Sequence, residues 1–411
     1  MLARRTPPHS LFCGMTLKVA TQSALLLGVS LLVLGCGTKM NLDEASRTSH
    51  FRWFHKNKNP KFAEGLDFLD SNLQSSKVVG SPRARKKHWK LHWDPGRCTA
   101  PRGNELEITP HLEVFDRKTA YWMSWLSVQA YRQGTDALTH LGKVGLSHVD
   151  LLKEDSTGFQ AFVGSTNDFV IVSFAGTSEL IDYVTDLTFA SRPETIRGIP
   201  GNVHIGFLNV LERSWAKLLE LVKKHSTDNK PILMTGHSMG GAQAVISAAR
   251  LAKLGFPVDS IYIYAVPRIG DETYANHIES QFPKRVWRFV NNEDIVPRLP
   301  PPPVAAEAFS RVFPGSSQEA IKLVFETLRY KHVGQMLLQD GRGGLSEPRA
   351  FDETEDIGYW DMVQQRTQGK NLPQMIFANW RMLFDHIPFA SHCQLNPPKA
   401  SRNRSFTSAI Q

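Results

Sequence analysis

A serine between two glycines is the residue of this chain whose neighbours best fit covalent chemistry. Residues 236–240 read Gly-His-Ser-Met-Gly and fit the pattern G-x-S-x-G. In that pattern a tight turn between a strand and a helix holds the serine in a strained backbone conformation with its hydroxyl exposed. Because the apolar run 231–235 precedes the turn and small residues follow it from Ala242, we expect Ser238 to act as a nucleophile. The alternative is an incidental glycine-rich turn.

An attacking serine creates an oxyanion, which needs at least two fixed hydrogen-bond donors. The backbone N–H of Met239, the residue after the serine, is the first candidate. The second donor should come from a loop after an earlier strand, and the apolar run 169–174 ends at Ala-Gly-Thr. We therefore expect Thr177 to donate through its N–H and its hydroxyl. The alternative is an ordinary threonine in a turn.

The acid that orients the general base should follow the nucleophile, at the end of a later strand. The apolar run 286–290 is followed by Asn-Asn-Glu-Asp, and Ile-Val-Pro at 295–297 then constrains the chain. We expect Asp294 to be this acid. Glu293 is its rival, although its longer side chain suits the geometry less well.

Three histidines follow the acid and could serve as the general base, namely His332, His386 and His392. We expect His386, because it comes directly after the last expected helix, residues 373–384, in a loop that could return to the serine. His332 precedes that helix and is expected to be structural or to line a pocket. The role requires an Nδ1–H group held by the acid and an Nε2 atom that faces the serine.

Strands and helices alternate along the middle of the chain, which predicts an α/β fold with a mainly parallel central sheet and helices on both faces. The expected strands are residues 158–163, 169–174, 231–235, 261–265 and 286–290. The expected helices are residues 119–132, 207–224, 242–253, 318–329 and 373–384. Loops are expected at the proline run 300–303 and at the glycine-rich stretch 341–344.

The N-terminus has the pattern of an export signal. A few basic residues are the only charges in residues 1–35, and the apolar run 24–34 is too short to cross a bilayer as a helix. Residues 33–36 resemble a bacterial lipobox, which implies cleavage before Cys36 and acylation of that residue. Several acyl chains would hold the protein on the cell envelope, in the outer membrane. The alternative is a plain signal peptide and a secreted protein in which Cys36 is incidental.

The predicted organisation has four parts. These are a signal peptide at 1–35, a basic tether at 36–110, a catalytic domain at 111–393 with an insertion near 300–350, and a disordered tail at 394–411.

The formal net charge of +9 comes partly from residues 83–97, where tryptophans lie among basic side chains. An exported protein rarely meets nucleic acid, so nucleic-acid binding is not expected. A solvated loop or contact with anionic lipid is the better interpretation. No spacing of histidine and cysteine suits a metal such as zinc, whereas Cys98 and Cys393 could pair in an oxidising compartment.

Taken together, these residues resemble the class 3 lipase family, whose familiar members are filamentous-fungal lipases. The motifs that carry the resemblance follow one another in family order at residues 172–177, 181–189, 203–207, 236–241, 266–271 and 294–298, followed by the pair 385–386. The resemblance implies an α/β-hydrolase fold with Ser238, Asp294 and His386 as the triad.

The same resemblance extends to the oxyanion site. It implies Thr177 and Met239 as donors, with Asp186 supporting the Thr177 hydroxyl. Ala175 departs from the family pattern, which commonly has an arginine there. Residues 178–184 correspond to the lid, but they are few and only modestly apolar.

The function that this resemblance implies is hydrolysis of carboxylic esters of lipids through an acyl-enzyme intermediate, with no metal or organic cofactor. The expected partners are a lipid or ester substrate and the membrane surface. A phospholipase A or lysophospholipase is the alternative within enzymes. An inactive lipid-binding protein of the envelope is the alternative from another class.

Overall fold

The computed structural model describes residues 106–111, 114–146, 148–176, 189–194, 197–313, 318–368, 382 and 385–396. The predicted signal peptide, the predicted acylation site Cys36 and nearly all of the predicted tether lie outside these residues, as does most of the helix expected at 373–384. Within the described part of the chain, no helix is long and apolar enough to cross a bilayer.

A seven-stranded sheet forms the centre of the molecule, with the strand order β1-β2-β3-β6-β7-β9-β11. Its strands are β1 His148–Glu154, β2 Phe159–Ser165, β3 Val170–Phe174, β6 Ile232–His237, β7 Val258–Tyr264, β9 Val286–Asn291 and β11 Gln335–Gln339. The first three pair antiparallel, and every pairing from β3 to β11 is parallel. The inner parallel strands β3, β6, β7 and β9 are buried along their whole length, as a sheet covered on both faces requires. The predicted mainly parallel α/β fold is confirmed.

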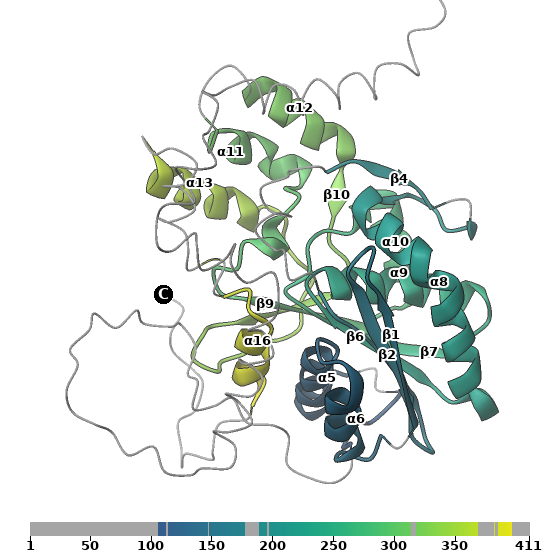
Figure 1. Cartoon of the computed structure of the whole chain (residues 1–411). Helices are drawn as coiled ribbons and strands as arrows, with labels where there is room; N and C mark the ends of the chain where they lie inside the picture. Colours follow the sequence, from purple (N-terminus) through teal and green to yellow (C-terminus); the bar gives the residue numbers. More distant parts are fainter. Residues whose placement is uncertain are drawn as a thin grey trace, which may run out of the picture.

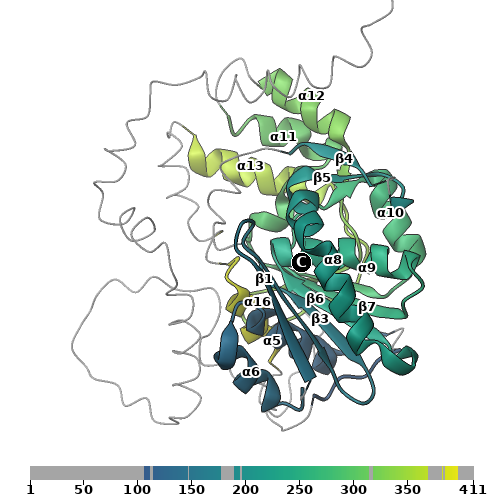
Figure 2. The same cartoon turned by 45° about the vertical axis from the view of Figure 1, so that its right-hand side comes forward.

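Helices cover both faces of this sheet (Figures 1 and 2). One face carries α5 Arg117–Gln129 and α16 Pro388–Leu395, with α6 Gly134–Gly142 near its edge. The other face carries α8 Ile205–His225, α9 Met239–Lys253 and α10 Glu272–Gln281. Each face has its own apolar core, because alternate residues of every strand point to opposite sides. For example, Val172 packs under α8 and α9, whereas Ile171 packs under α5.

Local sequence explains where α5 begins and where α8 ends. Asp116 caps α5 by accepting a hydrogen bond from the Thr119 amide at 2.8 Å. Helix α8 buries a stripe of apolar side chains that recur every three or four residues. Its last turn carries Lys223, Lys224 and His225, which suits the negative end of the helix dipole.

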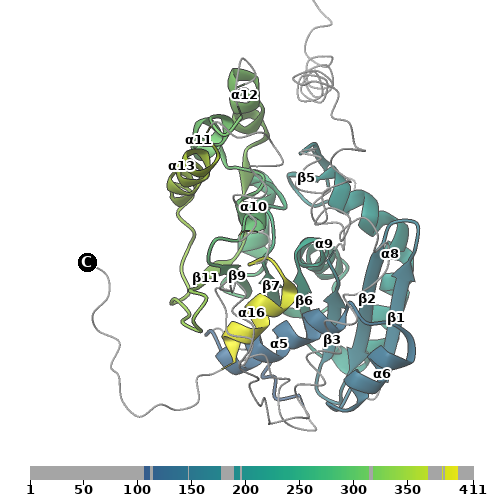
Figure 3. The same ribbon diagram turned by 60° about the vertical axis from the view of Figure 1, so that its left-hand side comes forward.

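A second unit of structure lies beyond the end of the central sheet. It contains a small four-stranded sheet in the order β10-β8-β5-β4, formed by β4 Ser191–Pro193, β5 Asn202–His204, β8 Gly270–Asp271 and β10 Tyr330–Lys331. It also contains α11 Ala306–Ser310, α12 Gln318–Leu328 and α13 Glu355–Thr367. These three helices form one group with an apolar core that includes Phe309 and Trp360 (Figures 1 and 3). The short 3-10 helices are η3 Thr227–Asn229, η4 Val296–Arg298 and η5 Pro303–Ala305.

Two predicted boundaries were wrong. The stretch 300–350 is not only an insertion, because it contains β11, which pairs with β9 as the last strand of the central sheet. The disordered tail was predicted to begin at Gln394, but Gln394 and Leu395 are buried and complete α16. The Gln394 side chain accepts a hydrogen bond from the Gly341 amide at 2.6 Å, which fixes this end of the helix against the loop after β11.

Candidate active site

Ser238 lies at the turn between β6 and α9, with φ 57° and ψ −129°. This backbone conformation is costly for any residue with a side chain, and it persists only where the surroundings enforce it. Here they do, because a Cβ atom on Gly236 would overlap the Gly240 backbone and one on Gly240 would overlap the end of β3. The two glycines therefore permit the close crossing of strand and helix that the sequence pattern predicted.

Hydrogen-bond donors for an oxyanion are available at the same turn. Helix α9 begins at Met239, and the first amides of a helix have no acceptor within it. On the opposite side of the turn lies Gly176, just after β3. It is so near the serine that a Cβ atom on it would lie 3.0 Å from the Cβ of Ser238. The loop that leads to the predicted donor Thr177 therefore passes beside the serine. Thr177 itself, Asp186 and the lid candidate 178–184 lie outside the described residues.

The predicted base and acid are brought together although they are far apart in sequence. His386 Nδ1 lies 3.0 Å from Asp294 Oδ1 and 2.9 Å from Asp294 Oδ2, and both side chains are buried. Burial lowers the pKa of His386 to about 3, so the imidazole is neutral at neutral pH, as a general base must be. Burial also raises the pKa of Asp294 well above its usual range, while the Val296 amide and the Arg298 charge oppose this effect.

His386 lies beside the nucleophile turn. His237 Nε2 is 2.7 Å from the His386 carbonyl oxygen, and the two rings are 4.7 Å apart. Among the described residues, His386 Nε2 is buried and has no hydrogen-bond partner, so it is not bonded to Ser238 Oγ either. Hydrogen bonds between nucleophile and base are often long before substrate binds.

The rival residues are engaged elsewhere. His332 is buried edge-on against Phe351 at 5.2 Å, and burial together with three nearby arginines lowers its pKa well below the usual value. Glu293 forms an ion pair with Arg366 at 2.7 Å. His392 stacks on Tyr121, and its Nδ1 is 2.8 Å from Ser124 Oγ.

Two residues that support His386 were not found from the sequence. Tyr131, just after α5, has its hydroxyl 2.9 Å from His237 Nδ1. Asn291, at the end of β9, donates from Nδ2 to the Asp385 carbonyl oxygen at 2.6 Å. Neither belongs to a motif, so no sequence signal pointed to them. Asn291 stands at the carboxyl end of a parallel strand, where polar side chains gather in such sheets, and that position was the one available hint.

The arrangement can therefore carry out nucleophilic acyl chemistry, with a strained serine, a neutral buried imidazole and a carboxylate partner for it. Among the described residues, no group of histidine, cysteine, aspartate and glutamate side chains could hold a metal ion.

Residues 171–304 match the family described as lipase, class 3. That segment of the chain is similar to class 3 lipases. The match includes Ser238 and Asp294 and ends before His386.

Individual relatives show the same similarity. The chain is 35% identical over 150 residues to secreted mono- and diacylglycerol lipase 1 of Fusarium solani, covering 35% of this chain and 44% of that protein. It is 34% identical over 148 residues to a lipase of Rhizomucor miehei, covering 34% of this chain and 39% of that protein. The class 3 lipase segment thus spans less than half of these relatives.

A longer and weaker similarity joins the chain to phospholipase A1-Igamma2, chloroplastic, of Arabidopsis thaliana, at 26% identity over 321 residues, 67% of this chain and 57% of that protein. Among solved structures, lipase II of Rhizopus niveus superposes with a TM-score of 0.43 at 19% identity, covering 57% of this chain and 85% of that one.

Proposed function

We propose that this protein is a serine ester hydrolase that cleaves carboxylic esters of lipids through an acyl-enzyme intermediate. The observation that carries the proposal is the strained Ser238 with the buried Asp294–His386 pair beside it. In this proposal Ser238, Asp294 and His386 are the catalytic residues. Met239 and Thr177 donate hydrogen bonds to the oxyanion, and Asp186 supports the Thr177 hydroxyl.

The reaction proceeds in two acyl-transfer steps. Ser238 Oγ attacks the ester carbonyl carbon as its proton passes to His386 Nε2, and the carbonyl oxygen becomes an oxyanion. The oxyanion collapses, the ester C–O bond breaks, and the leaving alcohol takes the proton from His386. Water then attacks the acyl-enzyme with His386 as base, which releases a carboxylic acid and regenerates Ser238. Asp294 keeps the proton of the resting imidazole on Nδ1 and stabilises the imidazolium that forms transiently.

The substrates that we propose are acylglycerols, since the relatives that match the class 3 lipase segment at more than 30% identity are named as lipases. Phospholipids are the second candidate, because the similarity that extends furthest along this chain among those described above is to a protein named as a phospholipase A1. Both classes present a carboxylic ester to the same site, so the serine chemistry is unchanged.

We further propose that the chain from residue 111 to the end of α16 at Leu395 forms the catalytic domain and that acylated Cys36, followed by the basic tether, holds it at a membrane. The apolar run 24–34 and the cysteine after it support this location. A Cys36→Ser variant tests it, because the variant should move from the membrane fraction to the soluble fraction. Equal fractionation of both proteins would favour simple secretion.

The function is tested by p-nitrophenyl esters from acetate to palmitate, acylglycerol emulsions and phosphatidylcholine vesicles, each with the wild type and Ser238→Ala. We expect a loss of several orders of magnitude in kcat with unchanged thermal stability. A fluorophosphonate probe should label the wild type alone. If the wild type neither labels nor hydrolyses any of these esters, the inactive lipid-binding scaffold becomes the better interpretation.

A further inference from the structure

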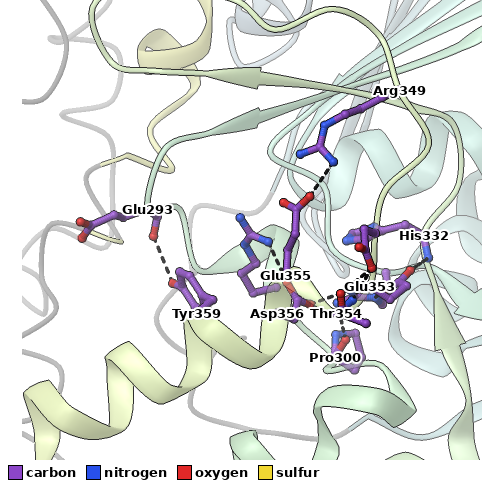
Figure 4. Close-up of polar contacts among 12 residues, drawn as sticks. Glu293, Pro300, His332, Arg349, Glu353, Thr354, Glu355, Asp356 and Tyr359 are labelled. Carbon is purple, nitrogen blue, oxygen red and sulfur yellow. Dashed lines mark hydrogen bonds and ion pairs between the residues drawn. The ribbon is translucent and has the colours of Figure 1, made fainter. Parts of the chain in front are cut away.

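The turn that carries Asp294 is held on both sides by a single helix, α13, which belongs to the helical group beyond the sheet. On the side before Asp294, the Tyr359 hydroxyl donates to the Glu293 carbonyl oxygen at 3.1 Å. Figure 4 shows Tyr359 pointing from α13 toward Glu293. About two turns further along α13, Arg366 donates to both carboxylate oxygens of Glu293, at 2.7 and 3.2 Å. Bidentate pairs of this kind fix orientation as well as distance.

On the side after Asp294, α13 holds the chain through its first turn. Asp356 accepts hydrogen bonds from Arg298 Nη1 at 2.7 Å and from Arg268 Nη2 at 2.6 Å. All three side chains are buried. Arg268 also donates to the Pro300 carbonyl oxygen at 2.9 Å, so the ion pairs tie the start of α13 to the chain that leaves the turn. Figure 4 labels Asp356 and Pro300, which Arg268 connects.

Among the described residues, the Asp294 carboxylate has no hydrogen bond to α13. Its carboxylate accepts hydrogen bonds from the Val296 amide at 2.9 Å and from His386 Nδ1. Its position relative to His386 therefore depends on where the turn lies, and α13 fixes the turn through the residue before Asp294 and through Arg298. A displacement of about 1 Å in a catalytic group can cost roughly 100-fold in rate.

We propose that Asp356, Tyr359 and Arg366 are positioning residues for the catalytic acid, so that α13 controls the rate of acyl transfer without a hydrogen bond to Asp294. This inference rests on the proposed function, because it assigns a role within the same triad. It also gives the helical group at this end of the molecule a role in the reaction in addition to its own apolar core.

Arg366 gives the sharpest test, because its side chain is 38% exposed and the Glu293 side chain that it leaves behind is itself 24% exposed. We expect Arg366→Gln to lower kcat about 10-fold, with KM and melting temperature nearly unchanged. This loss is smaller than the cost of displacing a catalytic group by a full 1 Å. Labelling by a fluorophosphonate probe should slow by the same factor. Arg366→Lys, which keeps the charge, should recover part of the loss.

A matched control is an ion pair that joins the same helix to the end of α11. Arg311 pairs with Asp361 of α13 at 2.9 Å, with both side chains similarly exposed, and this pair does not contact the turn. Arg311→Gln should leave kcat at the wild-type value. In a double-mutant cycle, Glu293→Gln combined with Arg366→Gln should lose no more activity than either variant alone.

The outcomes separate the two proposals. An inactive wild type would overturn the proposed function itself. An active wild type with an unimpaired Arg366→Gln, or with Arg311→Gln impaired equally, would overturn the positioning role. A kcat loss that follows the fall in melting temperature across Arg366→Gln, Tyr359→Phe and Arg311→Gln would show that α13 only stabilises the fold.

Discussion

His237 donates a hydrogen bond from Nε2 to the backbone carbonyl oxygen of His386 across 2.7 Å. The donor direction follows from the acceptor, because a carbonyl oxygen cannot donate. The neutral ring must then accept at Nδ1, where the Tyr131 hydroxyl lies 2.9 Å away. Burial and the nearby His386 keep the pKa of His237 well below its usual value, so this tautomer persists. The residue before the nucleophile thus holds the backbone of the proposed base.

Replacement of Tyr131 by phenylalanine tests this link. Without the hydroxyl, His237 Nδ1 is left as a buried acceptor with no donor, which costs about 1–3 kcal/mol. We expect the His237 ring to lose its fixed orientation and kcat to fall about 10-fold, as a small displacement of His386 implies. The check is a comparison of kcat and KM for the two proteins at equal folded fraction. Unchanged kcat would mean that Asn291 and Asp294 alone hold His386.

The crowding at the nucleophile turn predicts a strong effect of one methyl group. In Gly240→Ala the new Cβ would overlap the Phe174 carbonyl and the Ala175 backbone, so strand and helix must separate. We expect a loss of about 1–3 kcal/mol in the free energy of unfolding and of most activity. Gly358→Ala is the matched control, because Gly358 lies within α13 and a Cβ on it would meet nothing within 4 Å. That substitution should stabilise by up to about 1 kcal/mol, and denaturant unfolding measures both.

The burial of His386 predicts the pH dependence of the reaction. Its pKa is lowered to about 3, whereas an unperturbed histidine has a pKa of about 6.5. The neutral form that acts as base is therefore retained as pH falls through 6.5, and the acid limb of kcat/KM should lie below that value. A profile that loses half its value near pH 6.5 would contradict a buried base.

The same shift has a consequence for stability. A folded-state pKa below the unfolded-state value means that the unfolded chain binds more protons between about pH 3 and 6.5. The contribution of His386 is therefore complete above pH 6.5 and is lost as pH falls toward 3. His386→Gln removes this titration, so the fall in its melting temperature across that range should be shallower than that of the wild type.

The parts of the fold that could be predicted from the sequence are those with a local pattern. The strands at β3, β6 and β9 are buried on both faces and so read as continuous apolar runs. Strand β11 was missed because only Met336, Leu337 and Gln339 are buried in it, and it lies between proline-rich and glycine-rich loops. A short edge strand of this kind is specified by its pairing with β9 rather than by its own composition.

The residues of the candidate site also divide into those that a local sequence pattern predicts and those that it does not. Ser238 was predicted from five consecutive residues, since the elbow is a local structure. His386 was chosen by its order in the chain, by the helix expected before it and by the family resemblance, whereas the contact with Asp294 depends on the whole fold between them. Tyr131, Asn291 and the residues of α13 act through single contacts that join distant segments. One side chain at one position leaves no periodicity or spacing to recognise.

The last prediction concerns the helix that follows His386. Cys393 lies buried in α16 and is disulfide-bonded. The other cysteines, Cys13, Cys36 and Cys98, lie outside the described residues. Cys98 is the partner expected if the signal peptide is removed and Cys36 is acylated. The bond would then join α16 to the region before the catalytic domain and restrict the unfolded chain over a very long loop, which stabilises by about 2–5 kcal/mol.

Thermal unfolding with and without dithiothreitol distinguishes the possible partners. Reduction should lower the melting temperature of the wild type, and Cys98→Ser should already show the lower value and respond no further. Activity should fall along with stability, because α16 begins two residues after His386 and packs against α5 and β9. If Cys98→Ser melts like the wild type and still responds to the reductant, Cys393 pairs with another cysteine and the predicted acylation of Cys36 must be reconsidered.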